Sequence, residues 1–305
     1  MLSLTAIIST SHLNIYFLLL KNIKHITAPK VIIERINSST LEERAFNTSL
    51  HKRDPADTEA QSKDFNTELY RTNILNYAHL IDYKIHHEYK FTTYEIGILR
   101  QAATTGSITR RRPKHLVEEL QEIEDRLTTH WAPGKWFCRF NQCSTKDGIC
   151  EFPFTTPKNV IDSICTSARA IGCFETDDTL LFVVHNDSWA RDREVRCFVR
   201  HRRLTAISQY YWFTRGYFGG LDGHKLLQIA RRIDKFVSEH IDPLCDHLQT
   251  DDLVIDLYIG DSDIKIIELN SFGYWLSTGS ALFNWITDKS KLYGTTDSIH
   301  MRVLD

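Results

Sequence analysis

The stretch from Leu253 to Gly273 constrains the fold most, because it places acidic residues inside two short apolar segments. Leu253–Ile259 and Ile264–Leu269 have the length of strands and flank a Gly-Asp-Ser-Asp turn. Two apolar segments around such a turn are typical of a β-hairpin. The sequence therefore predicts an antiparallel hairpin with Asp256 inside its first strand.

Three oxygen-bearing side chains, Asp256, Glu268 and Asn270, belong to this predicted hairpin. Glu268 and Asn270 are two residues apart on one strand, so their side chains share a face. A carboxylate inside a buried strand is unfavourable unless a cation neutralises it. Oxygen donors that converge suit Mg²⁺, which usually keeps waters and shares phosphate oxygens. A salt-bridged hairpin with ordinary surface carboxylates is the alternative interpretation.

The same stretch carries a family resemblance. Residues 255–258, 267–273 and 281–285 resemble the C-terminal signature of the cell division cycle protein 123 family. Residues 193–199, followed by 204–209, resemble the paired central strands of that family. Residues 136–140, together with 144–147, resemble its N-terminal nucleotide-binding strand and turn. The likeness spans roughly residues 70 to 290, with its blocks in the family's order.

The resemblance implies an α+β, ATP-grasp-like fold, with two lobes and a nucleotide cleft between antiparallel sheets. It also implies Mg²⁺ and ATP as ligands, with one or two Mg²⁺ ions held by Asp256, Glu268 and Asn270. The ATP-binding residues that it implies are Arg139, Lys146, Val183, Val184, His185, Glu194 and Arg196.

Each of these ATP contacts has a physical role. Cationic side chains such as Arg139 and Lys146 balance a triphosphate where water is excluded. Backbone groups of 183–185 would read the adenine edge, and Glu194 with Arg196 would order ribose and phosphate. The alternative for Lys146 is a surface ion pair with Asp147 or Asp162.

Three functions remain open from the sequence. The first is a nucleotide-dependent assembly factor for a translation protein, since eukaryotic members of the family are named as assembly factors for translation initiation factor 2. The second is an ATP-grasp ligase or a phosphotransferase with an unknown acceptor. The third is an interaction module without nucleotide. The first two share one site, no catalytic residue is assigned, and ATP turnover would separate them.

The chain departs from the family pattern at two places. Tyr210-Tyr211-Trp212-Phe213 follows Gln209, where the family usually has a charged pair. Ser271 and Tyr274-Trp275 stand after Asn270, where the family typically has Pro and an acidic residue. The predicted metal ligands are retained, while the partner recognition that surrounds them is open to change.

Composition limits the partners and the compartment. A formal net charge of −2 gives no overall attraction to DNA or to an anionic membrane. The Arg110-Arg111-Arg112 run is either an RNA or phosphate contact or a solvated loop. Seven cysteines, an odd number without a secretory signal, predict reduced thiols in the cytoplasm. Cys138, Cys143 and Cys150 lack a zinc-binding spacing.

The chain is predicted to have an N-terminal extension and one two-lobed domain. Residues 1–20 are apolar but interrupted by polar residues, which favours a leader over a membrane anchor. Residues 37–66 are polar and predict a mobile linker. Residues 1–66 thus precede an ATP-grasp-like domain, 67–305, whose lobes cover about 67–178 and 179–290.

Hydrophobic periodicity places the remaining elements. Strands are predicted at 136–141, 179–185, 194–199 and 204–209, the last two as an antiparallel pair. Helices are predicted from Phe91 to Gly106 and over 116–127, 157–171 and 226–237.

Overall fold

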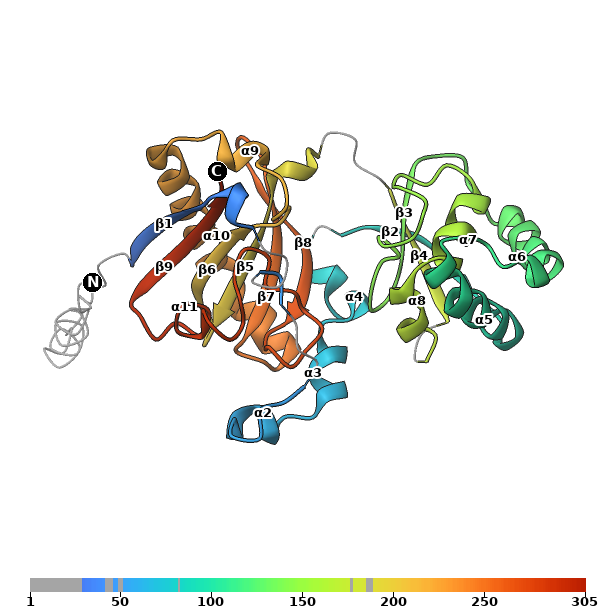
Figure 1. Cartoon of the computed structure of the whole chain (residues 1–305), viewed down its shortest axis with the longest axis horizontal. Coiled ribbons are helices and arrows are strands. Elements are labelled where there is room, and N and C mark those ends of the chain that lie inside the picture. The colour runs from blue at the N-terminus through green and yellow to red at the C-terminus, as the bar shows by residue number, and fades with distance from the viewer. Residues whose placement is uncertain (1–28, 42–45, 49–51, 82, 176–177, 185–188) are drawn as a thin grey trace, which may run out of the picture. The chain divides into compact units, whose positions relative to one another are not determined.

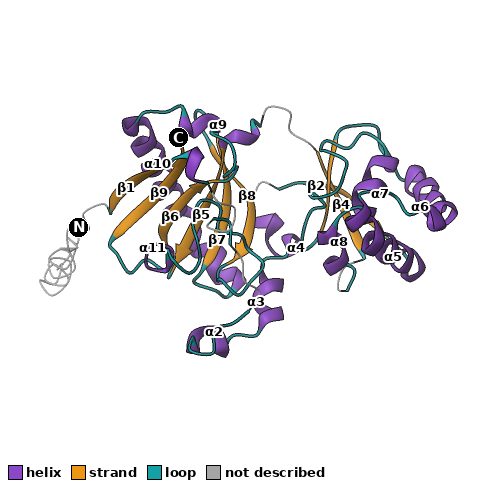
Figure 2. Ribbon diagram, viewed as in Figure 1, coloured by secondary structure: helices purple, strands orange, loops and turns teal. Residues whose placement is uncertain are grey.

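Alternating apolar residues build two β-sheets, each accompanied by helices (Figures 1 and 2). The six-stranded sheet has the order β1-β9-β6-β5-β7-β8, and the three-stranded sheet has the order β2-β4-β3. The first is formed by Lys30–Ile36 (β1), Ser298–Leu304 (β9), Arg203–Gln209 (β6), Glu194–Arg200 (β5), Leu253–Ile259 (β7) and Ile264–Ser271 (β8). The second is formed by Ile85–Lys90 (β2), Thr179–Val184 (β4) and Trp136–Phe140 (β3). The predicted α+β class is confirmed.

The helices fall into two groups along the chain. Those of the segment that contains the three-stranded sheet are Thr93–Thr109 (α5), Val117–Thr129 (α6), Pro157–Cys165 (α7) and Ala168–Cys173 (α8). Outside that segment lie Thr58–Ser62 (α2), Phe65–Arg71 (α3), Ile74–Tyr77 (α4), Gly216–Gly219 (α9), Gly223–Leu248 (α10) and Lys289–Leu292 (α11).

This computed structural model describes residues 29–41, 46–48, 52–81, 83–175, 178–184 and 189–305. The chain divides into Met1–Lys30 and Val31–Asp305, and the second unit carries the features discussed below. The predicted apolar leader, 1–20, lies outside the described residues. Within the described ranges, no helix has the length and apolar character needed to cross a membrane.

The predicted hairpin is confirmed, since β7 pairs with β8 in antiparallel register. β5 pairs antiparallel with both β6 and β7. The expectation of purely antiparallel sheets is wrong for one pair, because β9 lies parallel to β6. β9 follows the last strand that the periodicity predicted, and Ile299, Met301 and Val303 alternate into the core. A parallel neighbour needs a long connection, which residues 210–297 between β6 and β9 provide.

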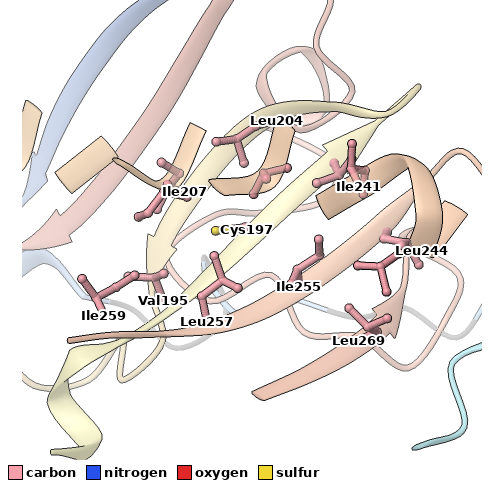
Figure 3. Close-up of a cluster of buried hydrophobic side chains, with 14 of the residues drawn as sticks. Val195, Cys197, Leu204, Ile207, Ile241, Leu244, Ile255, Leu257, Ile259 and Leu269 are labelled. Carbon is pink, nitrogen blue, oxygen red and sulfur yellow. The ribbon is translucent and has the colours of Figure 1, made fainter. Parts of the chain in front are cut away.

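One face of the six-stranded sheet packs against α10. Asp222 caps this helix by accepting a hydrogen bond from the Lys225 backbone N–H. Apolar side chains at a spacing of three to four residues then face the sheet, and the helix continues past the predicted end to Leu248. Figure 3 shows Ile241 and Leu244 of α10 in the same cluster as strand residues Val195, Cys197, Leu204, Ile207, Ile255, Leu257, Ile259 and Leu269.

Helix boundaries follow the capping residues more than the apolar pattern. Thr92 and Glu95 form the capping box that the sequence predicts for α5, which runs to Thr109 and not only to Gly106. The single helix predicted over 157–171 is wrong. The Thr166 hydroxyl bonds to the Asp162 carbonyl and ends α7, and Ser167 then caps α8 by accepting from the Ala170 N–H. Hydroxyl side chains compete in this way with the helical backbone bonds.

Part of the polar segment 37–66, predicted as a mobile linker, has secondary structure. Asp57 and Asp64 cap α2 and α3 by accepting backbone hydrogen bonds from Ala60 and Thr67. Glu59 of α2 forms an ion pair with Arg200 of β5, at 2.6 Å between Oε2 and Nη2. Few apolar groups therefore suffice here, because caps and ion pairs fix the short helices.

Candidate functional site

A row of polar side chains crosses the face of the six-stranded sheet opposite α10. In register, Arg302 of β9 lies opposite Ser208 of β6, and Ser208 lies opposite Arg196 of β5. Arg196 lies opposite Asp256 of β7, which lies opposite Glu268 of β8. Directly opposed residues place their side chains on one face of a sheet. Five adjacent strands thus bring five residues, spread over positions 196 to 302 of the sequence, into one line.

The Arg196–Asp256 pair forms the buried centre of this row. Nε and Nη2 of Arg196 each donate to one Asp256 carboxylate oxygen at 2.8 Å, and Asp256 is fully buried. Arg196 Nη1 also donates to the Gly279 carbonyl at 2.6 Å. Burial lowers the pKa of Arg196, but Asp256 outweighs this and holds that pKa above its ordinary value. The cation that the buried strand carboxylate required is therefore a side chain of the neighbouring strand.

Glu268 receives its countercharge from the three-stranded sheet. Nη2 of Arg139, a β3 residue with 3% exposure, lies 2.8 Å from Glu268 Oε1. Burial raises the pKa of Glu268, yet the charges of Arg139, Lys146 and Arg169 outweigh it and lower the pKa below its ordinary value. Three cations thus gather around a single carboxylate. The alternative of a salt-bridged hairpin therefore holds in part, since Asp256 and Glu268 each pair with an arginine, but these pairs are not at the surface.

A tight turn presents Lys146. The Gly148 N–H donates to the Thr145 carbonyl at 2.9 Å, which closes the turn. A Cβ at Gly148 would lie 2.5 Å from the Ser163 carbonyl oxygen, so this close approach to α7 requires glycine. At the tip of the turn, Lys146 Nζ donates to the Tyr210 hydroxyl and lies 4.9 Å from the centre of its ring.

The surface ion pairs considered for Lys146 do not form. Asp147 accepts from the backbone N–H groups of Ala168 and Arg169, at 2.9 and 3.2 Å, and so fixes the start of α8. Asp162 instead accepts from Arg112 and Lys158. Burial lowers the pKa of the Lys146 ammonium, but Tyr210 and Glu268 raise it to a net value above the ordinary one. Lys146 therefore stays charged inside the site.

Glu194 and Asn270 complete the acidic side of the row. Burial and the nearby Asp256 raise the pKa of Glu194 to about 8. Lys146 and Arg196 oppose this rise without cancelling it. Nδ2 of Asn270 donates to Asp256 Oδ2 at 3.1 Å, which leaves its amide oxygen as an acceptor.

A cavity of about 1640 Å³ adjoins these groups. Its lining contains seven of the residues predicted from the sequence, namely Arg139, Lys146, Val183, Glu194, Arg196, Glu268 and Asn270. Asp256 is not among them, since it lies beneath Arg196. The side chain of Val184 and the whole of His185 lie outside the described residues, so their predicted contacts stay predictions.

The donor set fits a hard cation only in part. Among the described residues, no group of three or more His, Cys, Asp or Glu side chains is arranged to hold a metal. Both oxygens of Asp256 already accept from Arg196. Glu194, Glu268 and the Asn270 oxygen remain on the cavity wall as donors. Because Mg²⁺ commonly uses one or two carboxylates with phosphate oxygens and waters, this smaller set is compatible with it.

Sequence reasoning did not place Trp189 and Tyr258 at the cavity, and it gave Arg169 only as a weak candidate for a phosphate contact. Arg169 lines the cavity from α8, and Tyr210 lies between Lys146 and Arg196, with the Arg196 guanidinium 4.9 Å from its ring centre. Trp189 and Tyr258 stack at 5.1 Å on another part of the lining. Tyr210 was detectable as a departure from the family pattern. The cavity position of Arg169 depends on the break between α7 and α8.

Two residues of the arginine run bond within the protein. Arg110 Nη1 donates to the carbonyls of Asp147 and Thr166, and Arg112 pairs with Glu124 and Asp162. These bonds connect the segment after α5 to α6, to α7 and its C-terminal end, and to the turn that contains Asp147. A solvated loop is therefore the wrong description of Arg112, and its guanidinium is already paired with two carboxylates.

Comparisons with known proteins agree with this geometry. The D123 family model matches residues 184–305. A relative from Candida albicans, named translation initiation factor eIF2 assembly protein, is 31% identical over 94 residues, which are 30% of this chain. The matched part spans only 26% of that curated relative.

Two solved structures from Schizosaccharomyces pombe share the fold. C-terminally truncated Cdc123 matches with a TM-score of 0.55 and 17% identity, over 79% of this chain and 98% of its own. Cdc123 from the same organism matches with a TM-score of 0.54 and 16% identity, over 78% and 98%. The chain thus shares the fold of these two Cdc123 structures. Residues 184–305 are thus similar to the D123 family, in agreement with the resemblance to the cell division cycle protein 123 family found in the sequence.

Proposed function

We propose that the cavity binds Mg-ATP and that the chain acts as a nucleotide-dependent factor in the assembly of translation initiation factor eIF2. The observation that carries the first part is the division of charge along the cavity wall. Arg139, Lys146 and Arg169 come from the segment of the three-stranded sheet, whereas Glu194 and Glu268, together with Arg196 paired to Asp256, come from the six-stranded sheet. This is the arrangement that a metal–triphosphate requires, with cations for the phosphates and oxygen donors for the metal.

Each part of the wall has a distinct task in this proposal. Lys146 and Arg169 bind phosphate oxygens, and Arg139 keeps Glu268 ionised. Glu268 and the Asn270 oxygen hold Mg²⁺, with Glu194 as the further donor that loses its proton when the ion binds. The bound ion supplies positive charge that neutralises phosphate oxygens. Arg196, held by Asp256, supports the metal donors from the next strand.

This assignment revises the role of one predicted ligand. Asp256 was expected to coordinate Mg²⁺, but its two oxygens accept from Arg196 at 2.8 Å. In the proposal it therefore positions Arg196 and Asn270. A protein that only binds ATP and an enzyme that turns it over would use the same cavity wall. Release of ADP in the presence of an acceptor would therefore identify an enzyme.

The binding proposal is tested by titrating ATP into the protein, with Mg²⁺ and with EDTA, in a calorimeter. We expect binding only with Mg²⁺. Lys146→Ala should weaken it by about 10- to 100-fold, the range for one lost hydrogen bond to a charged group. Lys158→Ala is the matched control, since this lysine is 60% exposed and pairs with Asp162. Equal heats with EDTA, or wild-type affinity in Lys146→Ala, would contradict the proposal.

The partner is proposed from the name of the Candida albicans relative. We expect immobilised protein to retain one purified eIF2 subunit, and to retain it better when Mg-ATP is present. Lys146→Ala should lose the nucleotide-dependent part and Lys158→Ala should keep it. If the subunit is retained equally with and without nucleotide, partner binding does not depend on the cavity. If no eIF2 subunit is retained, the proposed assembly role is wrong.

A further inference from the structure

Two thiols meet on the wall of the cavity, apart from the charged row. Cys143 Sγ and Cys173 Sγ lie 2.9 Å from each other, and both residues line the cavity. Both sulfurs also approach one acceptor, the Arg169 carbonyl, at 3.6 and 3.7 Å. A disulfide bond measures about 2.05 Å, so the two sulfurs would need to approach by less than about 1 Å.

The backbone holds both cysteines in place. Cys143 follows β3 in a turn that the Phe140 N–H closes by donating to the Cys143 carbonyl at 2.8 Å. Ser144, the next residue, forms an antiparallel bridge with Arg139. Cys173 is the last residue of α8, whose start is fixed by the Asp147 carboxylate. Two fixed segments, 30 positions apart in sequence, thus present their thiols to each other.

The two thiols differ in accessibility and acidity. Cys173 is 1% exposed, whereas Cys143 is half-buried on the cavity side. The hydrogen bond from Cys173, together with the charges of Arg169 and Arg139, outweighs the effect of burial and lowers the pKa of Cys143 to about 7. A half-exposed thiolate beside arginines is the kind of cysteine that oxidants attack first. Cys138, Cys165 and Cys197, in contrast, have pKa values raised by burial.

We propose that Cys143 and Cys173 form a reversible redox site, in which hydrogen peroxide oxidises the pair to a disulfide on the cavity wall. The Cys143 thiolate attacks one peroxide oxygen, breaks the O–O bond and forms a sulfenic acid, with hydroxide as leaving group. The Cys173 thiol then attacks the sulfenic sulfur and releases water. Overall, two thiols lose their hydrogens, the peroxide is reduced to two water molecules, and an external thiol reverses the reaction.

The bond would join the turn that leads to Lys146 with the last residue of α8. The same helix carries Arg169 near its start. These are the two cationic segments of the cavity wall on this side. A disulfide at this place therefore restrains the two segments, which would otherwise adjust their positions to a bound anion. Such cysteine pairs in a reducing compartment are transient and redox-sensing, and seldom structural.

The test exposes the full chain to hydrogen peroxide, blocks remaining thiols under denaturing conditions and maps peptides by mass spectrometry. We expect a linked peptide pair with Cys143 and Cys173, an intact mass lower by the two thiol hydrogens, and recovery with dithiothreitol. Cys173→Ser should instead accumulate a sulfenic acid at Cys143 that dimedone traps. Cys150→Ser, a half-buried cavity cysteine with a raised pKa, is the matched control and should keep the linkage.

This experiment uses no nucleotide, so its result does not depend on whether the protein binds ATP. A map in which Cys143 and Cys173 remain thiols while other cysteines oxidise would overturn the proposal. A linkage of Cys143 to Cys150 would overturn it as well. Because the wild-type map alone distinguishes these results, the conclusion does not depend on the folding of a variant.

Discussion

The two faces of the six-stranded sheet are formed by the same strands but are stabilised by different interactions. The face toward α10 is a continuous apolar layer that includes Val195, Cys197, Ile255 and Leu257. The other face carries the charged row, in which alternate residues of the same strands form ion pairs. One apolar contact can replace another at modest loss. A buried charge, however, needs its own partner in the right place.

This contrast separates robust from fragile parts of the fold. The α10 face is stabilised by many small contributions, each proportional to the area removed from water. On the opposite face, the charge of Asp256 is neutralised by one ion pair with Arg196, and the charge of Glu268 by one ion pair with Arg139. The cavity lies beside the fragile face.

The largest expected effect comes from breaking the central ion pair. Arg196→Met leaves Asp256 fully buried without its cation, and we expect a loss of about 3–5 kcal/mol in the free energy of unfolding. Urea denaturation of the single variants and of Arg196→Met/Asp256→Leu measures this. The double variant should recover much of the loss. Additive losses in the double variant would show that the pair is not a coupled unit.

A smaller effect is expected on the apolar face. Leu257→Ala removes a fully buried side chain from β7, and we expect a loss of about 2–4 kcal/mol. Unlike the ion pair, this loss should not depend on pH. Leu227→Ala on α10 is the control, since that side chain is 38% exposed and should change stability by less than about 1 kcal/mol. Equal losses in both variants would contradict the packing described here.

The smallest effects, opposite in sign, concern two carboxylates at different ends of the charged face. Burial raises the pKa of Glu34, but Lys291, His300 and Arg302 outweigh it and lower the pKa to about 2. The folded state therefore gains stability from ionised Glu34 above pH 4.5, the ordinary value, and loses it as the pH falls toward 2. Glu34→Gln should flatten the acid side of the stability profile.

Glu194 predicts the reverse dependence. Its pKa is raised to about 8, so the folded state keeps a proton that the unfolded chain releases above 4.5. Stability should therefore fall as the pH rises from 4.5 to 8, and Glu194→Gln should reduce that fall. Denaturation at several pH values, for wild type and both variants, measures the two slopes. The same slope in wild type and Glu194→Gln would place Glu194 in ordinary solvent.

The sequence determined the elements that depend on local pattern. Apolar runs and a turn sequence defined the β7–β8 hairpin, and the capping box at Thr92 defined the start of α5. The family blocks also selected Arg139, Lys146, Glu194, Arg196, Glu268 and Asn270, all of which line one cavity. These features are carried by neighbouring residues, so they can be read without knowing the fold.

Tertiary structure alone decided how the charges are shared. Sequence spacing placed Asp256 with the metal donors, but strand register put Arg196 directly opposite and engaged both of its oxygens. The parallel partner of β6 and the Cys143–Cys173 contact likewise join distant segments. Register and long-range packing are set by the whole core, and a one-residue slip would invert every face. The assembled sheet therefore decides which carboxylate is neutralised inside the protein and which stays available to a ligand.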